Sequence, residues 1–225
     1  AKAKEINHKP SRREMDMLLS TGEQISIALL AMALNDLGIP SISMTGSQMG
    51  IMTTDAHTKA RINYIKTDKI RKELDAGKVI IVAGFQGITE DGEITTLGRG
   101  GSDTTAVAIA AAVKADLCEI YTDVDGVYTA DPRMVEGTQK LEKITHDEML
   151  ELASLGAKVL HPRSVEIAKI HNVKLCVRSS FDTTKEGTFV VANELLEKEF
   201  VVTGLACDQK VAKIGIFDLE DKPGS

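Results

Sequence analysis

The sequence contains no tryptophan, and aromatic residues make up only 4% of its 225 residues. We therefore expect no aromatic platform on which nucleic-acid bases stack. Positive charge is also scarce, since 27 Lys and Arg stand against 33 Asp and Glu and the formal net charge is −6. A surface of this sign does not attract a phosphate backbone, so nucleic acid is not an expected partner.

Long hydrophobic runs and paired cysteines are missing as well. Apolar runs such as Ile27–Leu34 are far shorter than the roughly 20 residues that cross a bilayer, so we expect no membrane association. The cysteines, Cys118, Cys176 and Cys207, are odd in number and far apart, which indicates buried, reduced thiols of a cytoplasmic protein. The five histidines have no metal-ligand spacing, so no metal site is predicted from them.

Short apolar segments alternate with helical patterns through most of the chain. Strands are expected at Ser41–Met44, Val79–Ala83, Leu117–Thr122 and Lys174–Val177, and helices at Lys66–Ala76, Ala106–Ala115, Thr145–Ser154 and Pro162–His171. This alternation predicts an α/β protein with a mostly parallel sheet covered by helices on both faces. Ligands of such sheets lie beyond the carboxyl ends of the strands.

The glycine-rich run Leu97–Thr105 is the most informative stretch. Its three glycines let the backbone turn sharply, and the helix behind it offers unpaired N–H groups to an anion. Arg99 suits a carboxylate or a phosphate, Ser102 suits the same anion, and Asp103 suits the nucleophile or Mg²⁺. A plain tight turn is the alternative interpretation.

Two more segments have both a structural and a functional interpretation. Ser20 and Glu23 have the spacing of a capping box, but Glu23 also suits a substrate ammonium group. The segment Thr122–Arg133 is either an acidic turn or a nucleotide loop, in which Tyr128 packs on a base and Arg133 reaches phosphate.

A fourth segment, Gly156–Pro162, contains Lys158 and His161. Lys158 is either a solvated charge or a phosphate contact, and His161 is expected to be structural. The chain has no P-loop, no Gly-x-Gly-x-x-Gly after its first strand and no Gly-x-Ser-x-Gly elbow, which disfavours P-loop, Rossmann and serine-hydrolase chemistry.

Taken together, the motifs resemble those of the aspartate kinases (aspartokinases), which have the amino-acid kinase fold. The matching stretches are Ser20–Glu23, Thr95–Thr105, Tyr121–Arg133 and Lys158–Ser164, with further similarity at Glu14–Leu19, Thr45–Gln48 and Val82–Gly87. The resemblance covers almost the whole chain. It implies a three-layer αβα sandwich of the carbamate kinase-like type.

The resemblance also implies a reaction, phosphoryl transfer from MgATP to the side-chain carboxylate of L-aspartate. The product, 4-phospho-L-aspartate, begins lysine, threonine and methionine biosynthesis. In this interpretation Glu23 and Arg99 bind aspartate, Gly100, Gly101 and Ser102 line the substrate side, and Asp103 holds the catalytic arrangement with Arg99. The residues implied for ATP are Thr122, Asp123, Tyr128, Asp131, Arg133 and Lys158.

The sequence departs from this family at both ends. The family's first strand and its Lys-Phe/Tyr-Gly-Gly loop, which supplies a catalytic lysine, are not present, so we expect this chain alone to be inactive. Residues 1–192 are interpreted as the catalytic domain, 193–199 as a charged helical linker, and 200–225, with strands at Phe200–Cys207 and Val211–Phe217, as the start of a truncated ACT regulatory domain. ACT pairing implies a homo- or hetero-oligomer.

Two alternative functions stay open from the sequence. One is another enzyme of the same fold, an acetylglutamate, glutamate or uridylate kinase. The other is a non-catalytic regulatory subunit, which the missing lysine loop favours and the presence of Arg99 and Asp103 disfavours.

Overall fold

The structure is a computed structural model that describes residues 2–157, 159–192 and 202–207. Its elements in chain order are α1 (Lys2–Ile6), α2 (Arg12–Leu19), α3 (Thr21–Asp36), β1 (Ser41–Met44), β2 (Ile51–Thr53), β3 (Ile62–Ile65), α4 (Asp68–Asp75), β4 (Val79–Val82), β5 (Gln86–Ile88), β6 (Ile94–Thr96), α5 (Gly101–Val113), β7 (Cys118–Thr122), β8 (Lys143–Thr145), α6 (His146–Ser154), α7 (Pro162–Ile170), β9 (Leu175–Ser179) and β10 (Thr188–Val191).

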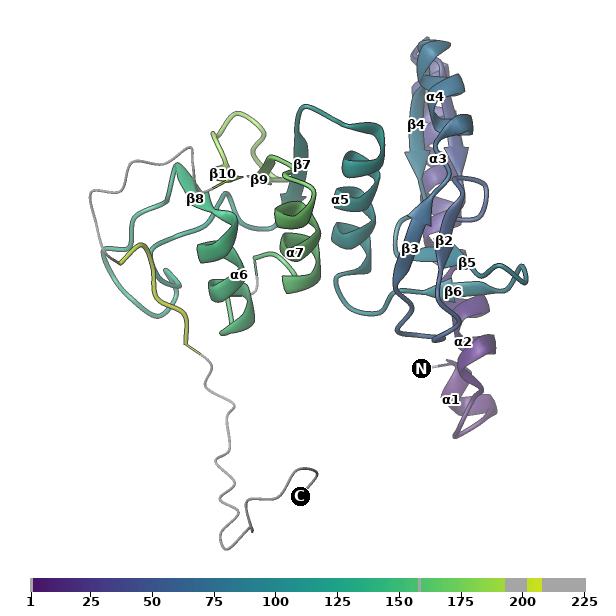
Figure 1. The fold of residues 1–225 in the computed structure, drawn as a ribbon, viewed down its shortest axis with the longest axis horizontal. Helices are drawn as coiled ribbons and strands as arrows, with labels where there is room; N and C mark the ends of the chain where they lie inside the picture. Colours follow the sequence, from purple (N-terminus) through teal and green to yellow (C-terminus); the bar gives the residue numbers. More distant parts are fainter. Residues whose placement is uncertain (1, 158, 193–201, 208–225) are drawn as a thin grey trace, which may run out of the picture.

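These elements form two groups along the long axis of the molecule (Figure 1). The first group holds α1 to α4 and β1 to β6, and the second holds α5 to α7 and β7 to β10. Helix α5 stands between them, in contact with β7 and α7 on one side and with β3 on the other. Because the glycine-rich turn leads directly into α5, it lies where the two groups meet.

The predicted α/β class is confirmed. Strand β1 pairs in parallel with β4, β7 with β9, and β8 with β10, while β9 and β10 are antiparallel. Among the described residues these parallel pairs belong to two separate sheets. Strands β1 and β4 form a two-stranded sheet, and a four-stranded sheet has the order β7-β9-β10-β8. A third, mixed sheet, β3-β2-β5-β6, was not predicted, because its strands contain polar residues or glycine and do not form apolar runs.

The capping box predicted at Ser20 and Glu23 is wrong. Ser20 has helical angles (φ −66°, ψ −16°), and its hydroxyl donates to the Met17 carbonyl oxygen at 2.9 Å instead of capping α3. The physical reason is that α2 runs almost directly into α3, so the Ser20 N–H already donates to the Asp16 carbonyl oxygen. Glu23 is therefore not engaged by the helix start.

Helices α2 and α3 together form an apolar stretch, Arg12–Asp36, whose 25 residues are long and apolar enough to cross a bilayer by length and composition alone. Helix α3 packs on β1 and β4, with Ile27 and Ala31 buried. A helix that covers a sheet passes the same test of length and composition, so this stretch does not by itself indicate a membrane protein.

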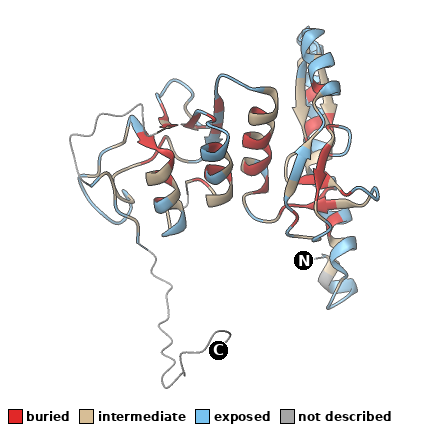
Figure 2. Cartoon of the chain, in the orientation of Figure 1, coloured by how far each residue is buried: buried red, intermediate tan, exposed pale blue. Residues whose placement is uncertain are grey.

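The main hydrophobic core lies in the second group. There α5, α6 and α7 cover the four-stranded sheet, and the fully buried side chains include Val107, Ile144, Met149, Val165 and Leu175. The first group has a much smaller core around Met44, Met49, Ile51 and Ile70, and Figure 2 shows the corresponding difference in buried ribbon. Since burial of each such side chain contributes roughly 1.5–3 kcal/mol, the second group contributes more of the hydrophobic stabilisation.

The cysteine prediction holds for two of three residues. Cys118 and Cys176 are free and buried, and burial raises the pKa of the Cys118 thiol to about 11. Cys207 is free but exposed, contrary to prediction, because its segment lies on the surface. The strand predicted over Phe200–Cys207 is also wrong for residues 202–207, which have no regular structure and make one backbone bond, from Leu205 N to the Thr129 carbonyl oxygen. The predicted linker 193–199 and the strand Val211–Phe217 lie outside the described residues.

Candidate active site

The glycine-rich turn connects β6 to α5 and uses two left-handed residues. Gly98 has φ +77° and Gly100 has φ +67°, a region that side chains rarely adopt. Helix α5 begins at Gly101, five residues before the predicted start, so Ser102 and Asp103 lie in its first turn. The turn therefore presents a helix N-terminus, as the anion-site interpretation requires.

Glu23 and Ser102 line one cavity of about 290 Å³. Its walls come from α3, the end of β4 and the first turns of α5, and its lining consists of Glu23, Ser26, Ile27, Val82, Gly84, Ser102, Thr105, Ala106 and Ile109. The Glu23 Oε2 atom is buried and has no hydrogen-bond partner. A buried carboxylate oxygen without a donor is costly, so this oxygen suits a cationic ligand group in the cavity.

The cavity opens at the carboxyl end of β4, where the backbone is strained. Phe85 has φ +69°, which is unusual for an aromatic residue, and its N–H donates to Thr105 Oγ1 at 3.0 Å. A side chain at Gly84 would contact the Ser102 backbone at 3.3 Å. The strand end and the first turn of α5 therefore approach closely, at the place where parallel sheets bind ligands.

The other predicted substrate residues lie in the turn itself. Arg99 is exposed, and no hydrogen bond or ion pair to another described residue engages its guanidinium. Asp103 is half-buried, and this burial raises the pKa of its carboxyl group, while His161 opposes the shift. Gly100 and Gly101 form the backbone between them. The turn thus offers a free cation and a partly desolvated carboxylate close together in sequence.

The segment predicted to bind ATP follows β7, and its polar groups pair with one another. Thr122 Oγ1 donates to Asp123 at 3.1 Å, and the Tyr128 hydroxyl donates to Asp125 at 3.0 Å. Burial is the main cause that raises the Tyr128 pKa, and this hydrogen bond adds to it.

Arg133 is paired in the same way. Its guanidinium donates to both carboxylate oxygens of Asp131, at 3.0 and 2.8 Å, although the Arg133 side chain is 83% exposed. The acidic partner raises the Arg133 pKa. Lys158, the remaining residue predicted for ATP, lies outside the described residues.

The residues before and within α7 bring a side chain that the sequence reasoning missed. His161 caps α7 and lies against the turn, since a Cβ on Gly100 would come within 2.2 Å of its ring. Arg163 donates to the carbonyl oxygens of Leu97 at 2.8 Å and Ala60 at 2.9 Å. The matched stretch Lys158–Ser164 contained Arg163, but its spacing alone does not show that it reaches the turn.

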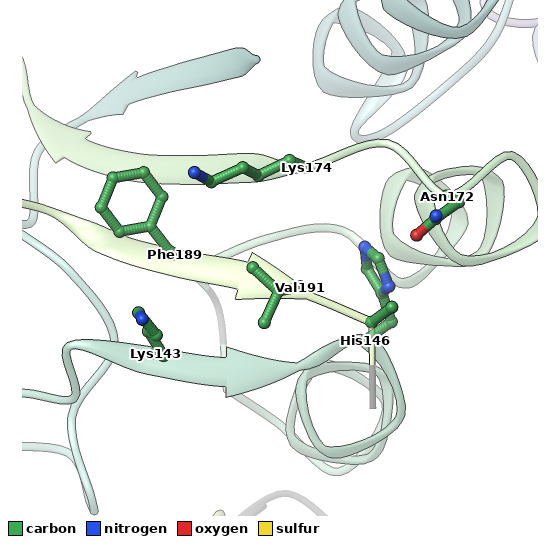
Figure 3. Close-up of a pocket in the computed structure, with 7 residues that line it drawn as sticks. Lys143, His146, Asn172, Lys174, Phe189 and Val191 are labelled. Atoms are coloured by element: carbon green, nitrogen blue, oxygen red, sulfur yellow. The ribbon is translucent and has the colours of Figure 1, made fainter. Parts of the chain in front are cut away.

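A second cavity, of about 360 Å³, lies on the sheet β9-β10-β8 and contains none of the predicted site residues. Figure 3 shows its lining, with Lys174 beside the Phe189 ring. The Lys174 Nζ atom lies 4.5 Å from the centroid of that ring, and His146 Nε2 donates to the Val173 carbonyl oxygen at 2.9 Å. It is larger than the Glu23 cavity, but no buried polar group without a partner lines it.

Within residues 2–157, 159–192 and 202–207, no cluster of three or more His, Cys, Asp or Glu side chains is arranged to hold a metal ion.

Comparisons of the sequence and the structure with known proteins point to the same family. The sequence profile of the amino acid kinase family matches residues 1–179. An aspartokinase of Geobacillus stearothermophilus is 57% identical over 218 residues, which is 97% of this chain and 53% of that protein. The chain therefore spans about half the length of the curated relatives it matches.

Two solved structures extend the comparison. Aspartate kinase from Synechocystis has 59% sequence identity and a TM-score of 0.72, over 84% of this chain and 31% of that one. E. coli aspartokinase III in complex with aspartate and ADP has 34% identity and a TM-score of 0.76, over 81% of this chain and 41% of that one.

Proposed function

The chain belongs to the amino acid kinase family, and from that premise we propose that it is part of an aspartate kinase. The enzyme would transfer the γ-phosphoryl group of MgATP to the side-chain carboxylate of L-aspartate and form 4-phospho-L-aspartate. Its relatives at 55–57% identity are named aspartokinase or aspartate kinase, and one solved relative holds aspartate and ADP together. The first step of lysine, threonine and methionine biosynthesis is the proposed place of this reaction.

One observation carries the substrate assignment, namely the buried Glu23 Oε2 without a partner in the cavity that Ser102 also lines. Aspartate has an ammonium group that can donate to this oxygen and two carboxylates that need cations or N–H donors. Arg99 is the free cation of the adjoining turn, and Gly100, Gly101 and Ser102 supply backbone and hydroxyl donors. The proposed roles are therefore ammonium binding for Glu23 and carboxylate binding for Arg99.

On the nucleotide side, we assign Thr122, Asp123 and Tyr128 to the nucleoside and Arg133 to the phosphates, with Asp131 holding Arg133. Lys158 is proposed as a further phosphate contact. Mg²⁺, when bound with ATP, supplies charge neutralisation between the phosphate oxygens.

The transfer step itself needs alignment more than covalent help. An oxygen of the aspartate side-chain carboxylate attacks the γ-phosphorus, and the bond to the bridging oxygen breaks as ADP leaves with its electron pair. Arg99 binds the acceptor carboxylate and offsets the repulsion between this carboxylate and the γ-phosphate. Asp103 holds the first turn of α5 in position next to Arg99.

The domain and location assignments are part of the same proposal. Residues 1–192 would form the catalytic domain, 193–199 a linker and 200–225 the start of an ACT domain through which the protein oligomerises. A cytoplasmic location agrees with the free thiols of Cys118 and Cys176.

The test is a coupled assay of ADP release by the gene product that contains this chain, with L-aspartate, L-glutamate, N-acetylglutamate and UMP as acceptors. Turnover with aspartate and a much slower rate with the other three is the expected result. Turnover with glutamate or UMP but not aspartate would reject the substrate assignment, and no ADP release with any acceptor would favour a regulatory subunit.

The Asp103→Asn variant tests the assigned geometry in that assay. We expect kcat to fall by about 100-fold, as for a displaced catalytic arrangement, while the KM for aspartate changes little. Unchanged turnover would reduce Asp103 to a residue of the helix start.

A further inference from the structure

The backbone just before the glycine-rich turn accepts a hydrogen bond from one side chain of helix α7, that of Arg163. This residue lies in the first turn of α7 and is half-buried. Its Nη1 donates to the Leu97 carbonyl oxygen, the last residue before the turn, and its Nη2 to the Ala60 carbonyl oxygen. The planar guanidinium thus joins two backbone segments that are far apart in the sequence.

Both of those segments are already fixed on the side of the first group. The Ala60 N–H donates to the Thr96 carbonyl oxygen, and the Leu97 N–H donates to the Phe85 carbonyl oxygen. Asp16, which is fully buried, accepts from the Thr58 N–H and from Thr96 Oγ1. Arg163 therefore connects α7 to the backbone at Ala60 and Leu97, which other hydrogen bonds already hold in place.

The turn that follows Leu97 is closed by local hydrogen bonds, among them those from the Thr104 N–H and hydroxyl to the Gly100 carbonyl oxygen. The Gly101 N–H bonds to the Gly98 carbonyl oxygen at 3.1 Å, and the left-handed glycines Gly98 and Gly100 have no side chains to lock them. His161, two residues before Arg163, presses on Gly100 from the same side. The start of α7 therefore contacts the backbone on both sides of Arg99, at Leu97 through Arg163 and at Gly100 through His161.

We propose that Arg163 is a positioning residue, which holds the turn so that the free guanidinium of Arg99 reaches the substrate cavity. It does not touch the reacting groups. The identity of the ligand rests on the proposed function, but the restraint of the turn does not.

The test uses this chain with Arg163→Met, Arg163→Lys and the control Arg71→Met. Arg71 is exposed on α4, and no described residue bonds to its guanidinium. Lysine keeps the charge but cannot bridge both carbonyls with a planar fork, so its effect is expected to lie between those of arginine and methionine.

Amide hydrogen exchange of Gly101 gives the readout of the turn, and that of Cys118, whose N–H bonds to the Lys174 carbonyl oxygen, gives the readout of the core. Calorimetric titration with L-aspartate and with ADP gives the two affinities. In Arg163→Met we expect Gly101 to exchange about tenfold faster and aspartate to bind about tenfold more weakly, as for the loss of charged hydrogen bonds. Cys118 exchange and ADP affinity stay as in the unmodified chain.

The outcomes separate the two proposals. Unchanged Gly101 exchange in both Arg163 variants would overturn the positioning role, whatever happens to aspartate affinity. If the unmodified chain binds no aspartate, the substrate assignment fails for this chain, and faster Gly101 exchange still supports the restraint by Arg163. If the Cys118 amide also exchanges faster in Arg163→Met, that variant has lost core stability. The exchange rate of the Gly101 amide in Arg163→Lys then decides whether Arg163 has the positioning role.

Discussion

The two halves of the proposed site differ in how their polar groups are partnered. On the substrate side, Glu23 Oε2 and the Arg99 guanidinium have no partner among the described residues. On the nucleotide side, Arg133 is held by Asp131, and the Tyr128 hydroxyl by Asp125. The substrate side is assembled from α3, β4 and α5, whereas the described residues of the nucleotide side belong to one stretch of chain, from Thr122 at the end of β7 to Arg133.

This difference indicates how each half would respond to a ligand. Unpartnered charges gain their first hydrogen bonds when substrate arrives, so their removal should cost nearly the full energy of a charged contact. A group that is already paired must exchange one partner for another, so its removal should cost much less. The predictions for Arg99 and Arg133 test this contrast directly, and those for Gly100 and Asp103 test the turn that carries the substrate side; they follow from the largest expected effect to the smallest.

Gly100→Ala should have the largest effect, because it damages the turn itself. The new Cβ would overlap the His161 ring and would sit at φ +67°, so we expect a loss of about 3 kcal/mol in the free energy of unfolding. Gly92→Ala is the matched control, since Gly92 has φ +87° but open space around it, and it should cost only about 1 kcal/mol. Urea denaturation measures both, and equal losses would show that His161 does not restrain the turn.

Arg99→Ala should reduce kcat/KM for aspartate by about 2 kcal/mol or more, mainly through KM, as for a lost charged contact. The measurement is the steady-state ADP-release assay in the gene product that contains this chain. An unchanged dependence of rate on aspartate concentration would remove Arg99 from the substrate side.

Arg133→Ala should weaken nucleotide binding by about 1 kcal/mol or less, because Arg133 must give up part of its exposed pair with Asp131 to reach a phosphate. Calorimetric titration with ADP checks this value. An effect as large as that of Arg99→Ala on aspartate would contradict the contrast between paired and unpaired groups.

Asp103→Asn should raise thermal stability slightly at neutral pH. Burial raises the pKa of Asp103 above its ordinary 3.8, so its charged form destabilises the folded state once the pH exceeds that value. The neutral amide removes this cost, and the gain in Tm should vanish as the pH falls below about 3.8.

Asp182→Asn is the control, since it should lower thermal stability at neutral pH where Asp103→Asn raises it. Hydrogen bonds from Thr184 lower the Asp182 pKa, so its charge stabilises the fold above its ordinary pKa and this contribution is lost on acidification. Thermal melts of both variants at pH 7 and pH 3.5 test whether the two substitutions change Tm in opposite directions at pH 7 and whether both changes shrink at pH 3.5. A lower Tm for Asp103→Asn at pH 7 would mean that the helix start stabilises the charge more than burial opposes it.

The sequence predicted strands that form apolar runs between helices better than the other strands. The segments around β1, β4, β7 and β9 were recognised because continuous apolar runs between helices are typical of parallel strands. The three- and four-residue strands of the mixed sheet and of β8 and β10 were missed. The capping box at Ser20 was predicted from spacing alone and failed, because spacing does not reveal that another helix ends at the preceding residue.

By itself, then, the sequence determined the α/β class, the glycine-rich turn and the types of residue available for an anionic substrate and a nucleotide. These are local properties, set by glycine conformations, apolar periodicity and the charges within a few residues. Only the tertiary structure decided that Glu23 shares a cavity with Ser102 and that Arg163 reaches the carbonyl oxygen of Leu97. Contacts between distant residues depend on how the sheets and helices pack, and no short-range pattern encodes that packing.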